Sequence, residues 1–145
     1  MLIAALRSMT SARLRVIAVD ATLRTAASAL SNPHVGILVV CDENRKAAGV
    51  VSKSDLVRHL SNVGVAEAPV AVLMSRTISC CHPEDDVYAT WQSMSAQSLQ
   101  NMPVLSTDSR PLGVLDIRDA LKVLFEQEER QEHLLINYIA GVGYQ

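Results

Sequence analysis

One short motif occurs twice in this chain, and its two copies are 64 residues apart (113 − 49 = 64 and 119 − 55 = 64). Gly-Val-Val-Ser-Lys-Ser-Asp at residues 49–55 returns as Gly-Val-Leu-Asp-Ile-Arg-Asp at residues 113–119. Repetition at a fixed spacing indicates a structural unit that is present more than once. The sequence therefore predicts one small unit in two copies, with any functional site where the copies meet or where they differ.

Both copies predict the same order of elements: strand, helix, strand, strand, helix. In the first copy these are a strand at 14–19, a helix that Asp20 caps and Pro33 ends, strands at 35–41 and 47–51, and a helix that Ser52 opens. In the second copy they are a strand at 78–81, a helix starting within 82–86, strands at 102–105 and 112–115, and a helix from about residue 117 into the charged segment 126–132.

Such a unit buries only one face of its sheet under its two helices, and a second unit covers the other face most simply. We therefore expect an α+β fold in which two β-α-β-β-α repeats pack sheet to sheet with pseudo-two-fold symmetry. The repeats are expected at residues 9–62 and 70–125, joined by a crossover linker at 61–69, with a C-terminal helix and apolar tail at 126–145.

Composition narrows the class of protein. The net charge of −2 provides no basic field for a nucleic acid polymer. Three cysteines without framework spacing argue against a secreted disulfide scaffold, and the histidines have no metal-ligand spacing. No apolar run has transmembrane length, so we expect a cytoplasmic protein without membrane contact.

The motif itself predicts a nucleotide. Gly49 lets another group approach its strand closely. Ser52 stands at a helix start that favours an anion, so its hydroxyl can donate to phosphate, and Lys53 and Lys46 can neutralise the phosphate charge. Asp55 is an acceptor suited to two ribose hydroxyls. Ser-x-x-Asp is also the spacing of a capping box, so a structural role is the alternative. No base–nucleophile pair is visible, which argues against an enzyme.

With both motifs in register, each unit resembles a CBS domain and the tandem resembles a stand-alone Bateman module over residues of about 9–125. The resemblance rests on Asp-Ala-Thr-Leu at 20–23, on the central strands at 39–42 and 102–105, and on both Gly-to-Asp segments. The resemblance implies a regulatory module and not an enzyme. Such a module requires no cofactor. Its expected ligand is an adenosine compound, either an adenine nucleotide (AMP, ADP or ATP) or S-adenosylmethionine. The ligand would bind in the cleft between repeats, and its presence would be signalled to an effector protein or through a dimer.

The resemblance also assigns residues in the first copy. Asp55 would take the ribose hydroxyls and Ser52 a phosphate oxygen. The base would lie between Val16 and the start of the next strand, at Val35, Gly36 and Ile37.

In the second copy, Asp119 is retained and Arg118 could meet a phosphate, but Asp116 replaces the usual Ser or Thr. A carboxylate at a helix start is a good cap and repels phosphate. We expect the first cleft to be the functional one and the second to be empty, cation-assisted or specific for a ligand without phosphate there. A scaffold of the same fold with vestigial sites is the alternative function.

Two surfaces predict self-association. The paired helices at 56–60 and 121–125 are expected to form a homodimer interface. The tail at 134–144 is too apolar to be free in water, and it is expected to pack against Leu2, Ile3 and Leu6 or against a second subunit.

Overall fold

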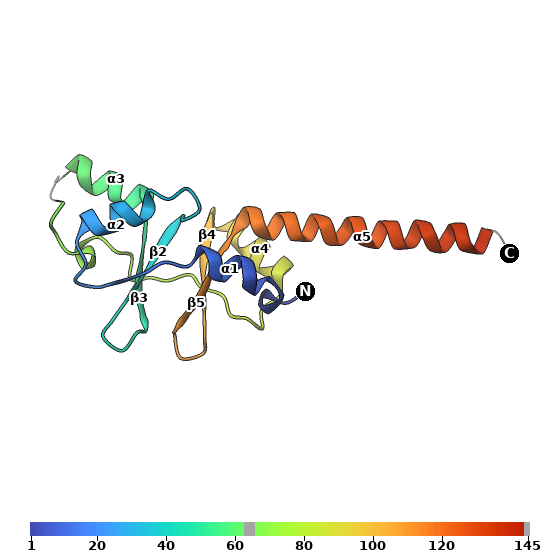
Figure 1. Cartoon of the computed structure of the whole chain (residues 1–145), viewed down its shortest axis with the longest axis horizontal. Coiled ribbons are helices and arrows are strands. Elements are labelled where there is room, and N and C mark those ends of the chain that lie inside the picture. The colour runs from blue at the N-terminus through green and yellow to red at the C-terminus, as the bar shows by residue number, and fades with distance from the viewer. Residues whose placement is uncertain (63–65, 144–145) are drawn as a thin grey trace.

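A computed structural model describes residues 1–62 and 66–143 (Figure 1). A 3-10 helix, η1 (Ile3–Leu6), and α1 (Arg7–Arg13) come first. The first repeat comprises β1 (Val16–Ala18), α2 (Leu23–Leu30), β2 (Ile37–Cys41), β3 (Ala47–Ser52) and α3 (Lys53–Asn62). A second 3-10 helix, η2 (Val70–Val72), leads to the second repeat, which comprises α4 (Val87–Ala96), β4 (Asn101–Leu105), β5 (Pro111–Asp116) and α5 (Ile117–Gly143). The predicted α+β class with two repeated units is confirmed.

The two sheets differ in their first strand. In the first repeat β1 pairs parallel to β2, and Val39 N–H donates to the Arg15 carbonyl at 3.0 Å. The predicted strand at 78–81 is wrong, because only an isolated bridge between Cys81 and Val104 forms there. The equivalents of Val39 and Arg15 are Pro103 and Ser79 (39 + 64 = 103 and 15 + 64 = 79). Pro103 has no N–H to donate to the Ser79 carbonyl. The parallel ladder therefore cannot extend from Cys81 back toward Ser79.

Helix α2 begins three residues after the predicted cap. Thr22, not Asp20, is the N-cap, and its hydroxyl accepts the Thr25 N–H at 3.2 Å. Thr22 is held extended by a bridge to Pro69, which delays the helix. At the start of α4 the cap is Asp86, which lies within the predicted segment.

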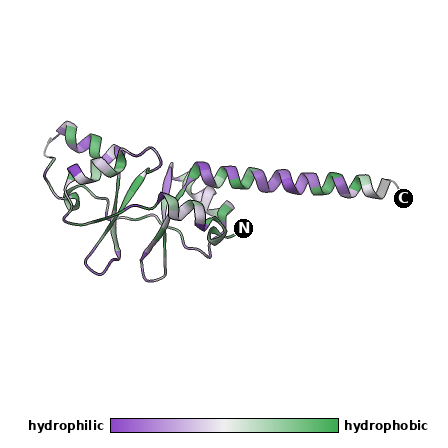
Figure 2. Ribbon diagram, in the orientation of Figure 1, coloured by the Kyte–Doolittle hydropathy of each residue, from purple (hydrophilic) through white to green (hydrophobic). Residues whose placement is uncertain are grey.

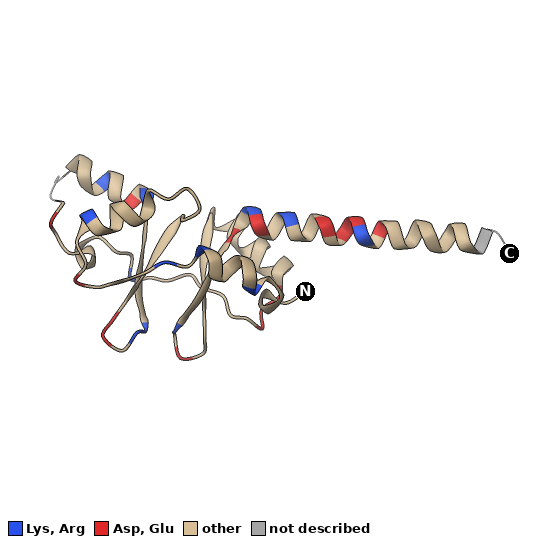
Figure 3. Cartoon of the chain, in the orientation of Figure 1, with Lys and Arg blue, Asp and Glu red and all other residues tan. Residues whose placement is uncertain are grey.

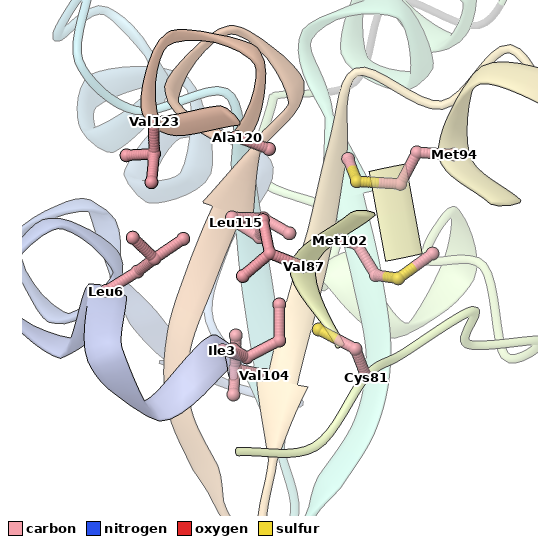
Figure 4. Packing of buried hydrophobic residues seen from close by; sticks show 10 residues of the cluster. All are labelled: Ile3, Leu6, Cys81, Val87, Met94, Met102, Val104, Leu115, Ala120 and Val123. Atoms are coloured by element: carbon pink, nitrogen blue, oxygen red, sulfur yellow. The ribbon is translucent and has the colours of Figure 1, made fainter. Parts of the chain in front are cut away.

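The repeats share a core between their sheets. Ile37, Val39 and Cys41 of β2 pack with Val114 of β5 in one buried cluster. Each repeat also has its own core. That of the second repeat takes in Ile3 and Leu6 from η1, as Figure 4 shows. The N-terminal segment is therefore part of the second repeat's core although it precedes the first repeat in the sequence.

The repeated glycines lie where the chain crosses between repeats. A Cβ on Gly113 would lie 2.8 Å from the carbonyl carbon of Thr10, and a Cβ on Gly49 would lie 2.8 Å from Met74 Sδ and from the Ser75 carbonyl oxygen. Thr10 and Met74 are themselves equivalent (74 − 10 = 64). Each segment that leads into one repeat thus packs on the last strand of the other repeat. The close approach that Gly49 was expected to permit is made by protein.

The last helix and the apolar tail form one continuous helix, α5, which extends well beyond the body of the molecule (Figure 1). Packing of the tail on the N-terminal segment is therefore wrong: Leu134 and Tyr138 are 69% and 71% exposed. Ile3 and Leu6 instead face the second repeat's core. Of the other predicted interface helix, Leu56 is buried, whereas Val57 and Leu60 are exposed.

Candidate functional site

The first motif forms a reciprocal capping box where β3 ends and α3 begins. Ser52 N–H donates to Asp55 Oδ2 at 3.0 Å, and Asp55 N–H donates to Ser52 Oγ at 3.2 Å. The structural interpretation of this spacing is thus correct as far as it goes. It does not use up the polar atoms: within residues 1–62 and 66–143 the Ser52 hydroxyl accepts one hydrogen bond and donates none. Within the same residues, Asp55 Oδ1 has only a loose contact with Arg58 Nη1, at 3.8 Å.

The start of β2 lies beside this motif. Ile37 pairs with Ser52 across the antiparallel ladder, so the start of β2 and the end of β3 lie at the same end of the first sheet, called this edge below. Val16 lies on the neighbouring strand opposite Val39 and is 46% exposed. Val35 is fully buried in the core of its own repeat. It therefore supports this edge from behind and does not line it.

Gly36 is the point at which the other repeat touches this edge. A Cβ there would collide with the side-chain amide of Asn101, the first residue of β4. Asn101 is the equivalent of Ile37 (37 + 64 = 101), and its buried Oδ1 has no hydrogen-bond partner among the described residues. The starts of the two central strands thus meet between the repeats. Sequence reasoning missed Asn101, although an amide in place of an isoleucine was a visible signal.

Positive charge is available near the first motif. Lys53 is exposed at the first turn of α3 and has no ion pair within residues 1–62 and 66–143, and the Arg58 side chain is 71% exposed. Lys46 lies at the opposite end of β3 from Ser52, so it is too distant to share a phosphate with it. A hollow of about 240 Å³ beside α3 is lined by Asp55, Arg58, His59, Asn62 and Leu73.

The second motif is arranged differently. Asp116, whose side chain is 3% exposed, accepts the backbone N–H of Arg118 at 2.8 Å and its Nη2 at 2.8 Å. Burial raises the pKa of the Asp116 carboxyl, but the hydrogen bonds and charge of Arg118 and the charge of Arg13 outweigh it, so the pKa is lowered. The guanidinium of Arg118, predicted to meet a phosphate, is therefore already paired with a carboxylate.

Asp119 is held by Arg13, the last residue of α1, which precedes β1. Arg13 Nε lies 2.6 Å from Asp119 Oδ2 and Arg13 Nη2 lies 3.1 Å from Oδ1, a bidentate pair. Arg13 Nη1 lies 3.6 Å from Asp116 and donates to the His34 carbonyl at 3.0 Å. We call this group the Arg13 clamp. It links the two repeats and occupies the carboxylate that a ribose would need.

Sequence reasoning missed Arg13 because its partner is 106 residues away. The equivalent residue in the other copy is Thr77 (13 + 64 = 77), so no arginine stands at the matching position for Asp55. Figure 3 shows basic and acidic residues side by side on the inner part of α5, the helix that carries Asp119. The part of the chain that the structure describes contains no cluster of three or more potential metal ligands. Within that same part, no helix combines the length and hydropathy that a membrane span needs.

The two paired β-α-β-β-α units define a class of repeat-built module. The sequence model of the CBS domain family matches residues 5–62 and again residues 67–126. The chain belongs to this family.

A curated relative and two solved structures are similar to this chain. A 17.7 kDa uncharacterized protein of Acidianus ambivalens is 22% identical over 128 residues, which cover 88% of this chain and 77% of that protein. The CBS domain pair of protein MJ0100, in complex with 5′-methylthioadenosine and S-adenosyl-L-methionine, aligns with a TM-score of 0.74 at 19% identity, over 88% of this chain and 98% of that one. The cytosolic domain of the Mg²⁺ channel MgtE, in complex with ATP, aligns with a TM-score of 0.65 at 21% identity, over 77% of this chain and 45% of that one.

Proposed function

We propose that this chain is a regulatory module that binds an adenosine compound at the Ser52–Asp55 motif, in the cleft between its repeats. One observation carries the proposal: the first motif keeps an unused hydroxyl hydrogen and an available carboxylate oxygen, whereas the second motif is held by the Arg13 clamp. Binding is thus proposed at the first cleft alone.

Each residue has a role that its position supports. Asp55 Oδ1 accepts ribose hydroxyls while Oδ2 stays on the Ser52 N–H. The Ser52 hydroxyl donates to a phosphate or another polar oxygen, and Lys53 balances its charge. Val16, Gly36 and Ile37 contact the base, with Val35 behind them. Asp119 and Arg118 take no part, because both are engaged within the protein.

The ligand class is supported by related folds. The compounds bound in the two solved structures, 5′-methylthioadenosine, S-adenosyl-L-methionine and ATP, all contain adenosine. Adenine nucleotides and S-adenosylmethionine are therefore the compounds to test. The module has no proposed reaction, and its output passes to an effector protein or through dimer geometry.

A ligand-free scaffold is the second candidate. It is favoured by the capping box, which gives Ser52 and Asp55 a structural role without any ligand. The two candidates differ in whether any adenosine compound binds at all.

Thermal melting tests the proposal. AMP, ADP, ATP, S-adenosylmethionine and NADH are added in turn, and binding is verified by calorimetry. A ligand at 100 times its Kd stabilises the fold by about 2.7 kcal/mol, which for this length raises Tm by roughly 5–10 °C. No binding by any compound would reject the sensor and favour the scaffold.

Matched variants locate the site. Asp55→Asn keeps an oxygen for the Ser52 N–H but loses the charge, and Asp55→Ala loses both. Both variants are expected to abolish the ligand-dependent shift, each measured against its own ligand-free Tm. Asp119→Ala is expected to lower the ligand-free Tm and keep the shift. Loss of binding in Asp119→Ala but not in Asp55→Ala would place the ligand in the other cleft.

A further inference from the structure

The outer part of α5 carries apolar side chains around most of its circumference, with Asn137 on the remaining side. Five side chains of its last turns are each more than half exposed: Leu134, Leu135, Ile136, Tyr138 and Ile139. Figure 2 shows that the middle of α5 is mainly hydrophilic and that hydrophobic residues follow it toward the far end of the helix. A helix that is apolar all round is ordinarily buried. This end of α5 therefore requires a covering surface that one copy of the chain does not provide.

A groove on the same helix offers such a surface. It lies between α4 and the inner part of α5, has a volume of about 490 Å³, and is lined by Tyr88, Trp91, Leu121, Leu124, Phe125, Gln127, Glu128 and Gln131. Tyr88 and Trp91 stack with their ring centroids 6.0 Å apart. Leu121 and Phe125 are 52% and 63% exposed. The groove is thus aromatic and apolar near the body of the molecule, with a polar outer end.

The groove and the tail share one face of α5. Residues recur along it at alternating spacings of three and four, which is the period of a coiled-coil seam. They are Leu121, Leu124, Glu128, Gln131, Leu135 and Tyr138. The seam is apolar at both ends and polar in its middle, so it can pair favourably with a reversed copy of itself.

We propose that α5 pairs antiparallel with α5 of a second copy of this chain, so that each apolar tail covers the other copy's groove. In this register Leu124 lies opposite Leu135, Leu121 opposite Tyr138, and Glu128 opposite Gln131 of the second copy. The Gln131 amide can donate to the Glu128 carboxylate. A parallel pair would instead place Glu128 opposite Glu128, and like charges there repel.

A two-fold arrangement gives a closed dimer. The two-fold axis makes both tail-to-groove contacts identical, so the assembly closes at two copies and covers the seam face of each tail. The apolar side chains that meet in it, Leu135 and Tyr138 of the tail and Leu121 of the groove, are each more than half exposed in one copy. The proposal is independent of any ligand at the Ser52–Asp55 motif.

Single-cysteine cross-linking tests the orientation. Leu124→Cys and Leu135→Cys are each made in a Cys80→Ser background, because Cys41 and Cys81 are buried. Within one chain the two positions are roughly 16 Å apart along the helix, too far for a disulfide. Oxidising a mixture of the two variants is expected to give a covalent dimer, and oxidising either variant alone is expected to give little. Cross-linking of each variant with itself would show a parallel pair, and no cross-link in the mixture would reject the pairing.

Sedimentation tests the surface. The full chain is expected to sediment as a dimer at micromolar concentration, and Leu135→Glu is expected to convert it to a monomer. Asn137→Glu places the same charge on the opposite side of α5 and is the control that stays dimeric. Both positions are exposed, so circular dichroism is expected to be unchanged. A monomeric wild-type chain, or equal loss of the dimer in both variants, would overturn the proposal.

Discussion

The two copies of the motif occupy the same position in their repeats but differ in which groups their polar side chains contact. In the first repeat, Ser52 and Asp55 bond to each other and leave polar atoms for a ligand. In the second repeat, Asp116 and Asp119 form ion pairs with Arg118 and Arg13 of the same chain. The helix starts are alike in position, and the difference lies in the cation that reaches one of them. Arginine donors of the protein itself occupy the carboxylates of the second copy.

The largest expected effect comes from removing that cation. Arg13→Ala removes the bidentate partner of Asp119 and the more distant of the two arginines near the buried Asp116, which keeps Arg118. Losing one partner of a buried pair costs 3–5 kcal/mol, and partial exposure of Arg13 reduces this to about 2–3 kcal/mol. Urea unfolding measures the change in the free energy of unfolding. Arg24→Ala, which breaks the exposed pair with Glu67, is the control and should cost less than about 1 kcal/mol. Equal losses would contradict the importance of the clamp.

The second-largest loss of stability is expected from substitutions at Gly113 and Gly49, the two glycines of the repeated motif. Gly113→Ala forces a Cβ against Thr10, and overpacking of this kind is expected to cost about 2 kcal/mol. Gly49→Ala is expected to cost a similar amount, because its Cβ would lie 2.8 Å from the backbone oxygen of Ser75 as well as from Met74 Sδ. Gly141→Ala has nothing within 4 Å and should be neutral or stabilising by up to about 1 kcal/mol. Thermal melts of the three variants establish the order, and a neutral Gly113→Ala would refute the close crossover.

Ser52→Ala tests the cap of the first copy. It removes the acceptor for Asp55 N–H, so the free energy of unfolding should fall by about 1 kcal/mol. Ser54→Ala, two residues on and exposed, is the matched control and is expected to change stability little. If both variants unfold alike, Ser52 does not cap α3.

The smallest expected effect is a pH dependence specific to the second copy. The pKa of Asp116 is lowered in the folded chain, so its contribution to stability is present above the ordinary Asp pKa of about 3.9 and is lost as pH falls through the folded value. Acidification below about pH 4 should therefore destabilise the wild type more than Asp116→Asn. Stability curves that fall in parallel for both proteins would exclude Asp116 as a contributor.

The repeat allowed the fold to be predicted, because alternating elements and the glycine and aspartate spacing are local signals. The Arg13 clamp could not be predicted, since it joins residues 106 positions apart and no pattern marks Arg13. The missing strand at 78–81 was predictable in principle: Pro103 stands where the first repeat has Val39, and a proline cannot donate to a ladder. The apolar character of the tail is plain from the sequence, but its helical continuation places it away from the N-terminal segment.

The exchange of lead-in segments between the repeats also governs how the chain must fold. Thr10 meets Gly113 and Met74 meets Gly49, so neither repeat is fully packed until distant parts of the chain have come together. Closing the long loop between Thr10 and Gly113 costs conformational entropy before its contacts form, which slows folding. Unfolding should accordingly be a single cooperative transition, in which the loss of one repeat removes the support of the other.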